Sequence, residues 1–182
     1  ATISNEELVV AFNTFVERHN ASNAEAIERG ELEALQPSAA DFIEKASGIK
    51  QRHVMYKEGI LDIHKMCPQF TKRPFDEPPE VVDMGLKAAS EAMARAGIQG
   101  QEIDLVIVAA SNTQRAYPAV AIEIQQALGA KGFAFDMNVA CSSATFAIVN
   151  GMNAIKTGTA NKVLIVNPEF ASPQVDYTNR DS

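Results

Sequence analysis

The sequence has no tryptophan, only three histidines and no long hydrophobic run. Its longest purely apolar stretch runs over six residues from Leu105 to Ala110, far too short to cross a membrane. No basic run exceeds Lys72-Arg73, and the formal net charge is −7. We therefore expect no nucleic-acid partner and no membrane association.

Cysteine is also scarce. Cys67 and Cys141 lie 74 positions apart, which offers neither a disulfide framework nor the ligand spacing of a zinc site, so we expect no metal. The first residues have neither the basic nor the apolar segment of a signal peptide. Both features predict a protein of the reducing cytoplasm.

What the sequence does contain is ordinary for a globular chain. It has 182 residues, 46% hydrophobic and 21% charged, which excludes a disordered tail, a collagen-like chain and a coiled coil. The length fits one domain or two small ones.

The hydrophobic periodicity predicts a series of helices and strands. A capping-box signal at Ser4–Glu7 and a second one at Ser22–Glu25 each open a helix. Further helices are expected at Ser38–Ser47, Val81–Ala96, Ala119–Leu128 and Ser142–Thr157, and strands at Leu105–Ala110, Phe133–Met137 and Lys162–Val166. The stretch from Gly48 to Pro79 is irregular, and the last segment from Asn167 is loop-like.

Strands and helices alternate in the second part of the chain. This order predicts an α/β fold with a mainly parallel sheet and helices on its faces. In such sheets ligands bind beyond the carboxyl ends of the strands. Loops that follow the expected strands are therefore the first place to look for a site.

The most informative residue of this kind is Cys141. It follows the expected strand Phe133–Met137 and precedes a helix that begins with small residues. The positive end of the helix dipole favours the thiolate, which is the nucleophilic form, and backbone N–H groups there can hold an oxyanion. The same pattern fits a buried structural cysteine, because cysteine is among the most buried residue types.

Five motifs, in order, resemble the β-ketoacyl-acyl-carrier-protein synthase III family. They read Ser-Gly-Ile-Lys-Gln-Arg from Ser47, Asp-Leu-Val-Ile-Val-Ala from Asp104, Ala-Tyr-Pro-Ala from Ala116, Phe-Asp-Met-Asn-Val-Ala-Cys-Ser-Ser-Ala from Phe135, and Asp-Tyr-Thr-Asn-Arg-Asp-Ser from Asp176. The resemblance implies a thiolase-like layered αβαβα fold, of which this chain is the N-terminal lobe with a mainly parallel central sheet. Helical and loop insertions are expected over about 1–79 and the core of the lobe over about 80–182.

The resemblance also implies an activity. Cys141 would accept an acyl group from acyl-CoA or acyl-carrier protein, and a decarboxylating Claisen condensation with malonyl-carrier protein would follow, in fatty acid biosynthesis. No cofactor is implied, because the CoA thioester is a substrate. The implied partners are acyl-CoA, acyl carrier protein and a second copy in a homodimer. The family's catalytic His and Asn match no residue here, so residues 1–182 alone are expected to be inactive.

Further site residues follow from the resemblance one at a time. Arg180, Phe42 and Ser38 match CoA-binding positions, and Tyr117 matches an aromatic residue that lines the partner's acyl pocket. Two departures concern CoA: Phe42 stands where many members have Trp, and Ala46 stands where they have Arg. The long stretch 48–79 is similar to a sub-branch that uses medium-chain, β-ketodecanoyl-type primers.

Two alternatives stay open. Another thioester enzyme of the same fold, such as a thiolase, an HMG-CoA synthase type or a polyketide or quinolone-type synthase, would keep the nucleophile and change the second substrate. A non-catalytic module that dimerises or binds carrier protein would leave Cys141 no more reactive than Cys67. For carrier-protein docking, Lys72-Arg73 is the basic candidate in an acidic chain.

Overall fold

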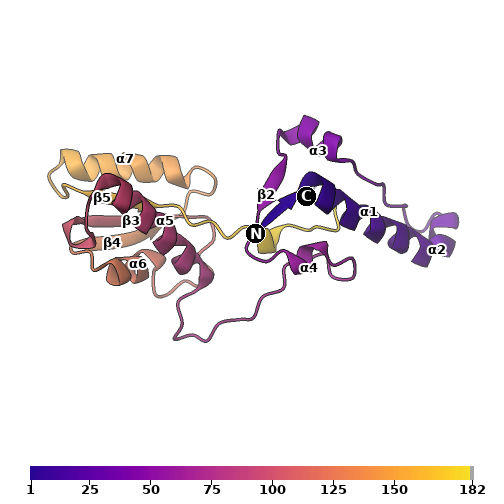
Figure 1. The fold of residues 1–182 in the computed structure, drawn as a ribbon, viewed down its shortest axis with the longest axis horizontal. Helices are drawn as coiled ribbons and strands as arrows, with labels where there is room; N and C mark the ends of the chain where they lie inside the picture. The colour runs from indigo at the N-terminus through magenta and orange to yellow at the C-terminus, as the bar shows by residue number, and fades with distance from the viewer. Residues whose placement is uncertain (181–182) are drawn as a thin grey trace. The chain divides into compact units, whose positions relative to one another are not determined.

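The computed structural model describes residues 1–180 and contains two compact units (Figure 1). One unit joins Ala1–Thr71 to the last segment, which starts at Ala171, and the other consists of Lys72–Phe170. Asp181 and Ser182, the last residues of the fifth motif, lie outside the described residues. The organisation expected from the sequence, with insertions over about 1–79 and a core over about 80–182, stays a prediction.

The second unit is built on a three-stranded parallel sheet in the order β4-β3-β5. Its strands are β3 (Leu105–Ala109), β4 (Phe133–Met137) and β5 (Val163–Val166). All five residues of β3 are buried, as an uninterrupted apolar run in a central strand requires. The predicted strands and their parallel arrangement are confirmed.

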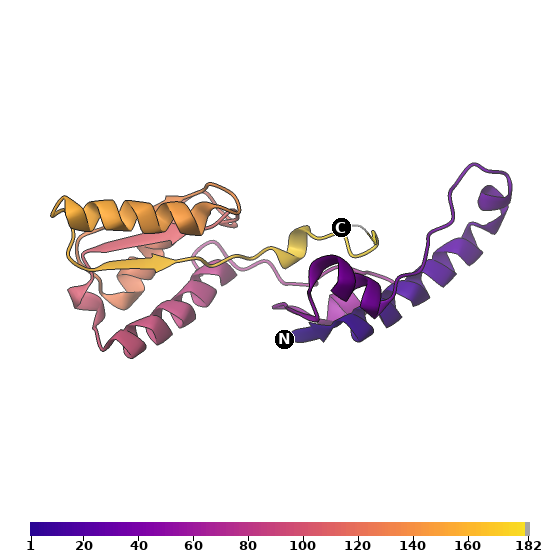
Figure 2. The ribbon, with the colours of Figure 1, turned by 90° about the horizontal axis from the view of Figure 1, so that it is seen from above.

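Helices cover both faces of this sheet (Figure 2). They are α5 (Glu80–Ala96), α6 (Val120–Leu128) and α7 (Ser143–Lys156). On one face Val106 and Val108 pack into a core with α5 and α6, and on the other Leu105 and Ile107 pack with Ala147 of α7. Successive side chains of β3 point to opposite faces of the sheet and enter two different cores. This explains why every residue of the strand is apolar.

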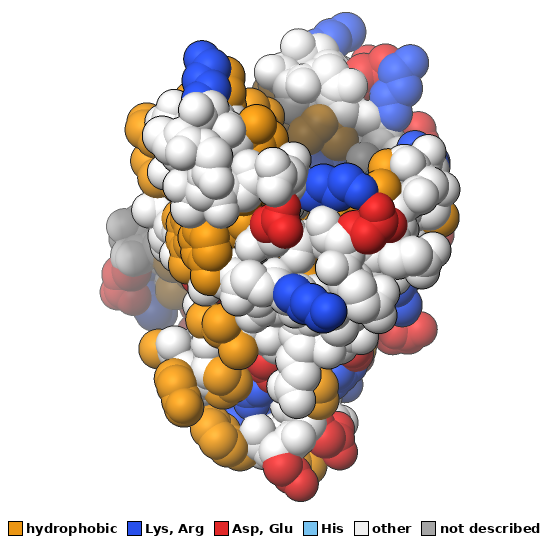
Figure 3. All heavy atoms as spheres, turned by 90° about the vertical axis from the view of Figure 1, so that its left-hand side faces the viewer, with side chains coloured by type: hydrophobic (Ala, Val, Ile, Leu, Met, Phe, Trp, Pro, Cys, Tyr) orange, Lys and Arg blue, Asp and Glu red, His pale blue; other side chains and the backbone are white. Residues whose placement is uncertain are grey.

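The outer face of α7 is apolar too. Its large hydrophobic side chains are between 44% and 60% exposed: Phe146, Ile148, Val149, Met152 and Ile155. Figure 3 shows hydrophobic side chains gathered along one side of the surface. A contiguous exposed apolar patch of this kind is typical of a surface that another protein segment covers.

The first unit joins a two-stranded antiparallel sheet to short helices. Its elements are β1 (Thr2–Ser4), α1 (Asn5–Ser22), α2 (Ala24–Glu28), α3 (Ala40–Ser47), β2 (Gln51–His53) and α4 (Glu58–Leu61). Its core includes Ile3, Phe12 and Val16, together with Tyr177 from the last segment. The predicted capping box of α1 is confirmed, since the Ser4 hydroxyl accepts from the Glu7 N–H at 3.2 Å and the Glu7 carboxylate accepts from the Ser4 N–H at 3.0 Å.

Two expectations for this unit were wrong. Ser22 does not cap α2, because Ser22 ends α1 and the N-cap of α2 is Asn23, which makes no side-chain cap bond. The Asn23 amide instead donates to the His19 carbonyl at 2.7 Å and satisfies the end of α1. The irregular stretch after Gly48 contains β2, which pairs with β1. Neither β1 nor β2 was expected from the sequence.

The described residues also include two 3₁₀ turns, Gly100–Glu102 and Ser172–Gln174. None of the helices described over residues 1–180 combines the length and hydrophobicity needed to span a lipid bilayer.

Asp104, at the start of β3, gives a pH-dependent prediction. Its carboxylate accepts the N–H groups of Asn161 and Lys162 at 2.8 and 3.0 Å, and these bonds lower its pKa. A folded-state pKa below the unfolded value means that this stabilisation is present above about pH 4 and is lost as the pH falls through the folded pKa. We therefore expect Asp104→Asn to lower the urea midpoint of the full-length protein at pH 7, and the two midpoints to converge as the pH falls through the folded-state pKa of Asp104. A gap that stays constant with pH would contradict this account.

Candidate functional site

Cys141 lies in the turn between β4 and α7, with an exposed side chain. Ser142 is the N-cap of α7 and Ser143 is its first residue, so the thiol stands directly before the positive end of a 14-residue helix. The position at a strand–helix junction agrees with the prediction. Cys141 is exposed in this structure, unlike the buried cysteine of the alternative interpretation, and its role as nucleophile stays a prediction.

The turn around Cys141 is held by its own polar groups. Ser143 is buried, and its hydroxyl accepts from the Val139 N–H and donates to the Ala140 carbonyl, both at 2.8 Å. The Asn138 side chain accepts from the Ala140 N–H at 2.9 Å. Ala140 adopts a φ of 47°, in the left-handed region. A non-glycine residue there needs support from its surroundings, which Asn138 and Ser143 provide.

Two backbone donors near the helix start are already engaged. The Ser142 N–H donates to the Val139 carbonyl at 3.0 Å and the Ser143 N–H to the Ala140 carbonyl at 3.1 Å. An oxyanion at this turn would therefore have to bind N–H groups other than those of Ser142 and Ser143. Lys72–Phe170, the unit that contains Cys141, has no histidine in its sequence, so it offers no imidazole as a base.

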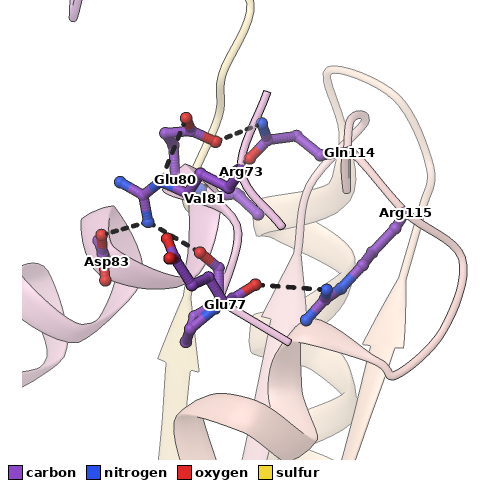
Figure 4. Close-up of polar contacts among 8 residues, drawn as sticks. Arg73, Glu77, Glu80, Val81, Asp83, Gln114 and Arg115 are labelled. Atoms are coloured by element: carbon purple, nitrogen blue, oxygen red, sulfur yellow. Dashed lines mark hydrogen bonds and ion pairs between the residues drawn. The ribbon is translucent and has the colours of Figure 1, made fainter. Parts of the chain in front are cut away.

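A second loop, residues 111–119 after β3, carries Tyr117, whose side chain is 79% exposed. The loop is tied to the start of α5 through Gln114 (Figure 4). The Gln114 amide donates to the carboxylate of Glu80 at 2.9 Å and accepts from the Val81 N–H at 2.9 Å. Glu80 is only 4% exposed, and the Arg73 guanidinium lies 3.3 Å from its carboxylate. A buried carboxylate thus joins two loops of this unit, with a cation to balance its charge.

Arg115 extends the same network. Its guanidinium donates to the Phe75 carbonyl at 2.8 Å and pairs with Glu123 of α6 at 2.5 Å. It also lies over the Phe75 ring, 5.1 Å from its centre. Figure 4 shows Arg115 reaching toward the segment that contains Glu77, whose carbonyl it contacts at 3.4 Å. The adjacent residues Gln114 and Arg115 therefore anchor the middle of the Tyr117 loop.

Of the basic pair Lys72-Arg73, considered for carrier-protein docking, Arg73 is bound to acidic groups of its own unit. Besides Glu80, Arg73 pairs with Asp83 at 2.7 Å and donates to the Pro78 carbonyl at 2.8 Å. Its charge is offset by two carboxylates, so it adds little positive potential at the surface.

Asp136 of β4 plays a part that the sequence did not reveal. Its two carboxylate oxygens accept the N–H groups of Val120 and Ala121, at 2.8 and 2.7 Å, and so cap the start of α6. A single acidic residue in an apolar strand was the available signal, because a partly buried carboxylate needs hydrogen-bond donors. Asp136 therefore links β4, the strand before Cys141, to α6, the helix after the Tyr117 loop.

The first unit contains a pocket of about 340 Å³. Ser38, Phe42 and Arg180, the three residues matched to CoA binding, all line it. The Arg180 guanidinium lies over the Phe42 ring at 5.1 Å from its centre, a cation–π contact. The Ser38 hydroxyl is buried and has no hydrogen-bond partner among residues 1–180. The pocket thus joins an aromatic face, a cation and an unused hydroxyl, and the role of these residues in CoA binding stays a prediction.

The backbone of Ser38 is held by Asn13, which lies outside the pocket lining. The Asn13 side chain accepts from the Ser38 N–H at 2.8 Å and donates to the Ser38 carbonyl at 3.0 Å. Burial raises the pKa of Tyr177, which also lines the pocket, although the nearby Arg52 opposes this effect. Among the described residues no cluster of three or more His, Cys, Asp or Glu side chains could hold a metal ion.

Comparisons with known proteins place the chain in one family. The sequence model of 3-oxoacyl-[acyl-carrier-protein] synthase III matches residues 135–182, which include Cys141 and Arg180. A β-ketodecanoyl-[acyl-carrier-protein] synthase of Pseudomonas aeruginosa is 55% identical over 172 residues, covering 94% of this chain and 49% of that protein. A β-ketoacyl-[acyl-carrier-protein] synthase III of Cereibacter sphaeroides is 32% identical over 85% of this chain and 42% of its own length.

Solved structures agree with this assignment. A 3-oxoacyl-[acyl-carrier-protein] synthase III of Aquifex aeolicus matches 80% of this chain and 41% of its own, with a TM-score of 0.64 and 28% identity. The corresponding synthase of Pseudomonas aeruginosa matches 100% and 43%, with a TM-score of 0.68 and 22% identity. These likenesses confirm the α/β, thiolase-like fold predicted from the sequence. The chain belongs to the 3-oxoacyl-[acyl-carrier-protein] synthase III family, and it spans about half the length of the curated relatives it matches.

Proposed function

We propose that the full-length protein is an acyltransferase of the β-ketoacyl-carrier-protein synthase III type. The Cys141 thiolate attacks the thioester carbonyl of an acyl-CoA or acyl-carrier protein, so that a new C–S bond forms and the CoA or carrier thiol leaves. Malonyl-carrier protein then loses carbon dioxide. Its enolate carbon attacks the acyl-Cys141 thioester, releases the cysteine and forms the β-ketoacyl-carrier protein. Covalent catalysis divides one difficult step into two easier ones.

The observation that carries this proposal is the exposed Cys141 at the start of α7, within the family-matched segment 135–182. A nucleophile must be accessible to its substrate, and the helix dipole favours the negative charge of the thiolate. The small neighbours Ala140, Ser142 and Ala144 leave room for an acyl thioester.

The primer is proposed from the relative that shares 55% identity, which is named a β-ketodecanoyl-carrier-protein synthase. Condensation with malonyl-carrier protein adds two carbons, so a β-ketodecanoyl product requires an octanoyl primer. We expect intact-mass spectrometry to detect an octanoyl adduct on the full-length protein after incubation with octanoyl-CoA, and peptide mapping to place it on Cys141. Acetyl-CoA is the matched comparison. No adduct with either thioester would favour a non-catalytic module.

Arg180 gives a prediction about CoA recognition. Its guanidinium and the Phe42 ring form a cationic and aromatic wall of the 340 Å³ pocket, suited to the phosphates and adenine of CoA. We expect Arg180→Ala to raise the KM for octanoyl-CoA about three- to tenfold, since hydrogen bonds to charged groups contribute about 1.5–3 kcal/mol before solvent screening. The kcat should stay within about twofold.

Lys45→Ala is the control for Arg180→Ala. Lys45 is a cation of the same unit that pairs with Asp41 on α3, outside the pocket lining. Equal KM values for the two variants would remove Arg180 from CoA recognition.

The assembly and compartment are part of the proposal. A homodimer is supported by Tyr117, a residue that is 79% exposed on a loop anchored through Gln114 and Arg115. The free thiols of Cys67 and Cys141 fit a reducing cytoplasm. The expectation that residues 1–182 alone do not catalyse condensation stays a prediction.

A further inference from the structure

The carboxyl ends of the three strands are tied together by side chains. Glu169 follows β5, Ser111 follows β3 and Asn138 follows β4. The Glu169 carboxylate accepts both the N–H and the hydroxyl of Ser111, each at 2.8 Å. The Ser111 carbonyl accepts from the Asn138 amide at 3.1 Å. Three segments far apart in sequence thus form one continuous chain of hydrogen bonds.

This series of hydrogen bonds ends at Ala140, the residue before Cys141. The other side of the Asn138 amide, its oxygen, accepts from the Ala140 N–H at 2.9 Å. Ala140 has a φ of 47°, which costs about 1–2 kcal/mol for a residue with a Cβ atom. The orientation of the Cys141 thiol depends on that backbone, because any relaxation of Ala140 rotates the next peptide unit.

The Asn138 side chain can bond both Ser111 and Ala140 only in one orientation of its amide. Its amide nitrogen must face the Ser111 carbonyl and its oxygen the Ala140 N–H. The two Glu169 contacts fix the Ser111 backbone and so fix the position of that carbonyl. Neither Glu169 nor Asn138 is needed for the hydrophobic core, since both are exposed.

We propose that Asn138 and Glu169 are positioning residues, which hold the strained Ala140 and thereby the attack geometry of Cys141. The proposal deepens the proposed function and rests on Cys141 being the nucleophile. A displacement of about 1 Å at a reacting group can lower a rate about a hundredfold. Removing this support should therefore lower kcat, while substrate binding, which uses other groups, stays nearly unchanged.

The test uses the full-length protein and two readouts. Condensation is measured with octanoyl-CoA and malonyl-carrier protein, and alkylation of Cys141 by iodoacetamide is followed by peptide mass spectrometry with Cys67 as the internal reference. We expect Asn138→Ala to lower kcat at least about tenfold with KM within about twofold, and to slow Cys141 alkylation relative to Cys67. Glu169→Ala should give a smaller loss of the same kind, at least about threefold.

Matched controls lie at the opposite ends of the strands. Asn161→Ala and Glu102→Gln alter the same residue types before β5 and β3, where neither side chain is near Cys141. Asn138→Asp keeps the oxygen that accepts from Ala140 but replaces the donor to the Ser111 carbonyl by an acceptor, so its kcat should lie between those of the wild type and Asn138→Ala. Because both residues act through Ser111, the double variant Asn138→Ala with Glu169→Ala should lose little more than Asn138→Ala alone.

Three outcomes would overturn the proposal: a kcat for Asn138→Ala within twofold of Asn161→Ala, a loss confined to KM, or losses of the two single variants that multiply in the double. If Asn138→Ala does not fold, Glu169→Ala decides by the same criteria, with a loss of kcat of about threefold at unchanged KM as the expected result. Alkylation needs no acyl substrate, so it tests positioning even if the wild type forms no acyl adduct and the proposed function fails.

Discussion

Replacing Cys141 by alanine is expected to abolish condensation by the full-length protein. The thiolate is the atom that becomes acylated, and no neighbouring group can take its place: the adjacent Ser142 carries a hydroxyl, which is a far weaker nucleophile at neutral pH without an activating base. We expect kcat to fall at least about a thousandfold, equivalent to about 4 kcal/mol of activation free energy. The octanoyl adduct should disappear from the mass spectrum at the same time.

The fold should tolerate this change. Cys141 is exposed, and the turn around it is held by Asn138 and Ser143 rather than by the thiol. The thermal unfolding midpoint should therefore stay within a degree or two of the wild type, as is usual for exposed positions. Loss of activity together with loss of the folded state would not fit this reasoning.

Cys67→Ala is the matched control. Cys67 is the other exposed cysteine, and its sulfur accepts a contact from the Gln69 amide at 3.1 Å. It lies in the first unit, away from any strand–helix junction, and we expect activity within about twofold of the wild type after its replacement. A Cys141→Ala protein that still forms the octanoyl adduct, or a Cys67→Ala protein that loses it, would overturn the assignment of the nucleophile.

The sequence was most informative where one physical signal dominated. The apolar run from Leu105 predicted a strand buried on both faces, and β3 is fully buried. Left-handed glycines after helices, such as Gly97 at φ 67°, marked helix ends because an αL cap favours glycine. The position of Cys141 between a strand and a helix followed from the same periodicity.

What the sequence could not provide depends on contacts between distant segments. The strands β1 and β2 have three residues each and pair across 51 positions, from Thr2 to His53, so neither leaves a local pattern. The capping of α6 by Asp136, from a strand that follows the helix, is equally non-local. The pairing of Arg73 with Glu80 and Asp83 was also not predicted, because the segment before α5 has no regular periodicity, and a role of Lys72-Arg73 in docking stays a prediction. Local periodicity reports elements, whereas polar partners are set by the fold.

The largest expected effect on stability is that of Gly132→Ala, at the turn into β4. Gly132 has a φ of 90°, and a Cβ atom there would lie 2.0 Å from the Asp104 carbonyl oxygen, a separation that real Cβ contacts do not reach. The same carbonyl accepts from the Phe133 N–H at 3.2 Å, the first link between β3 and β4. An added methyl group must therefore push the start of β4 away from β3, and we expect a loss of at least about 3 kcal/mol in the free energy of unfolding.

Gly158→Ala is the control that separates the steric clash of an added Cβ atom from the cost of a positive φ in alanine. Gly158 also has a positive φ, of 73°, but a Cβ atom there would meet nothing within 4 Å. Its replacement should cost only the conformational penalty, about 1–2 kcal/mol, so the difference between the two variants measures the steric term. Urea denaturation of the full-length protein followed by circular dichroism makes the comparison, and equal losses would show that β4 can shift freely. Because β4 leads into Asn138 and the Cys141 turn, the same displacement should lower kcat in Gly132→Ala and leave it unchanged in Gly158→Ala.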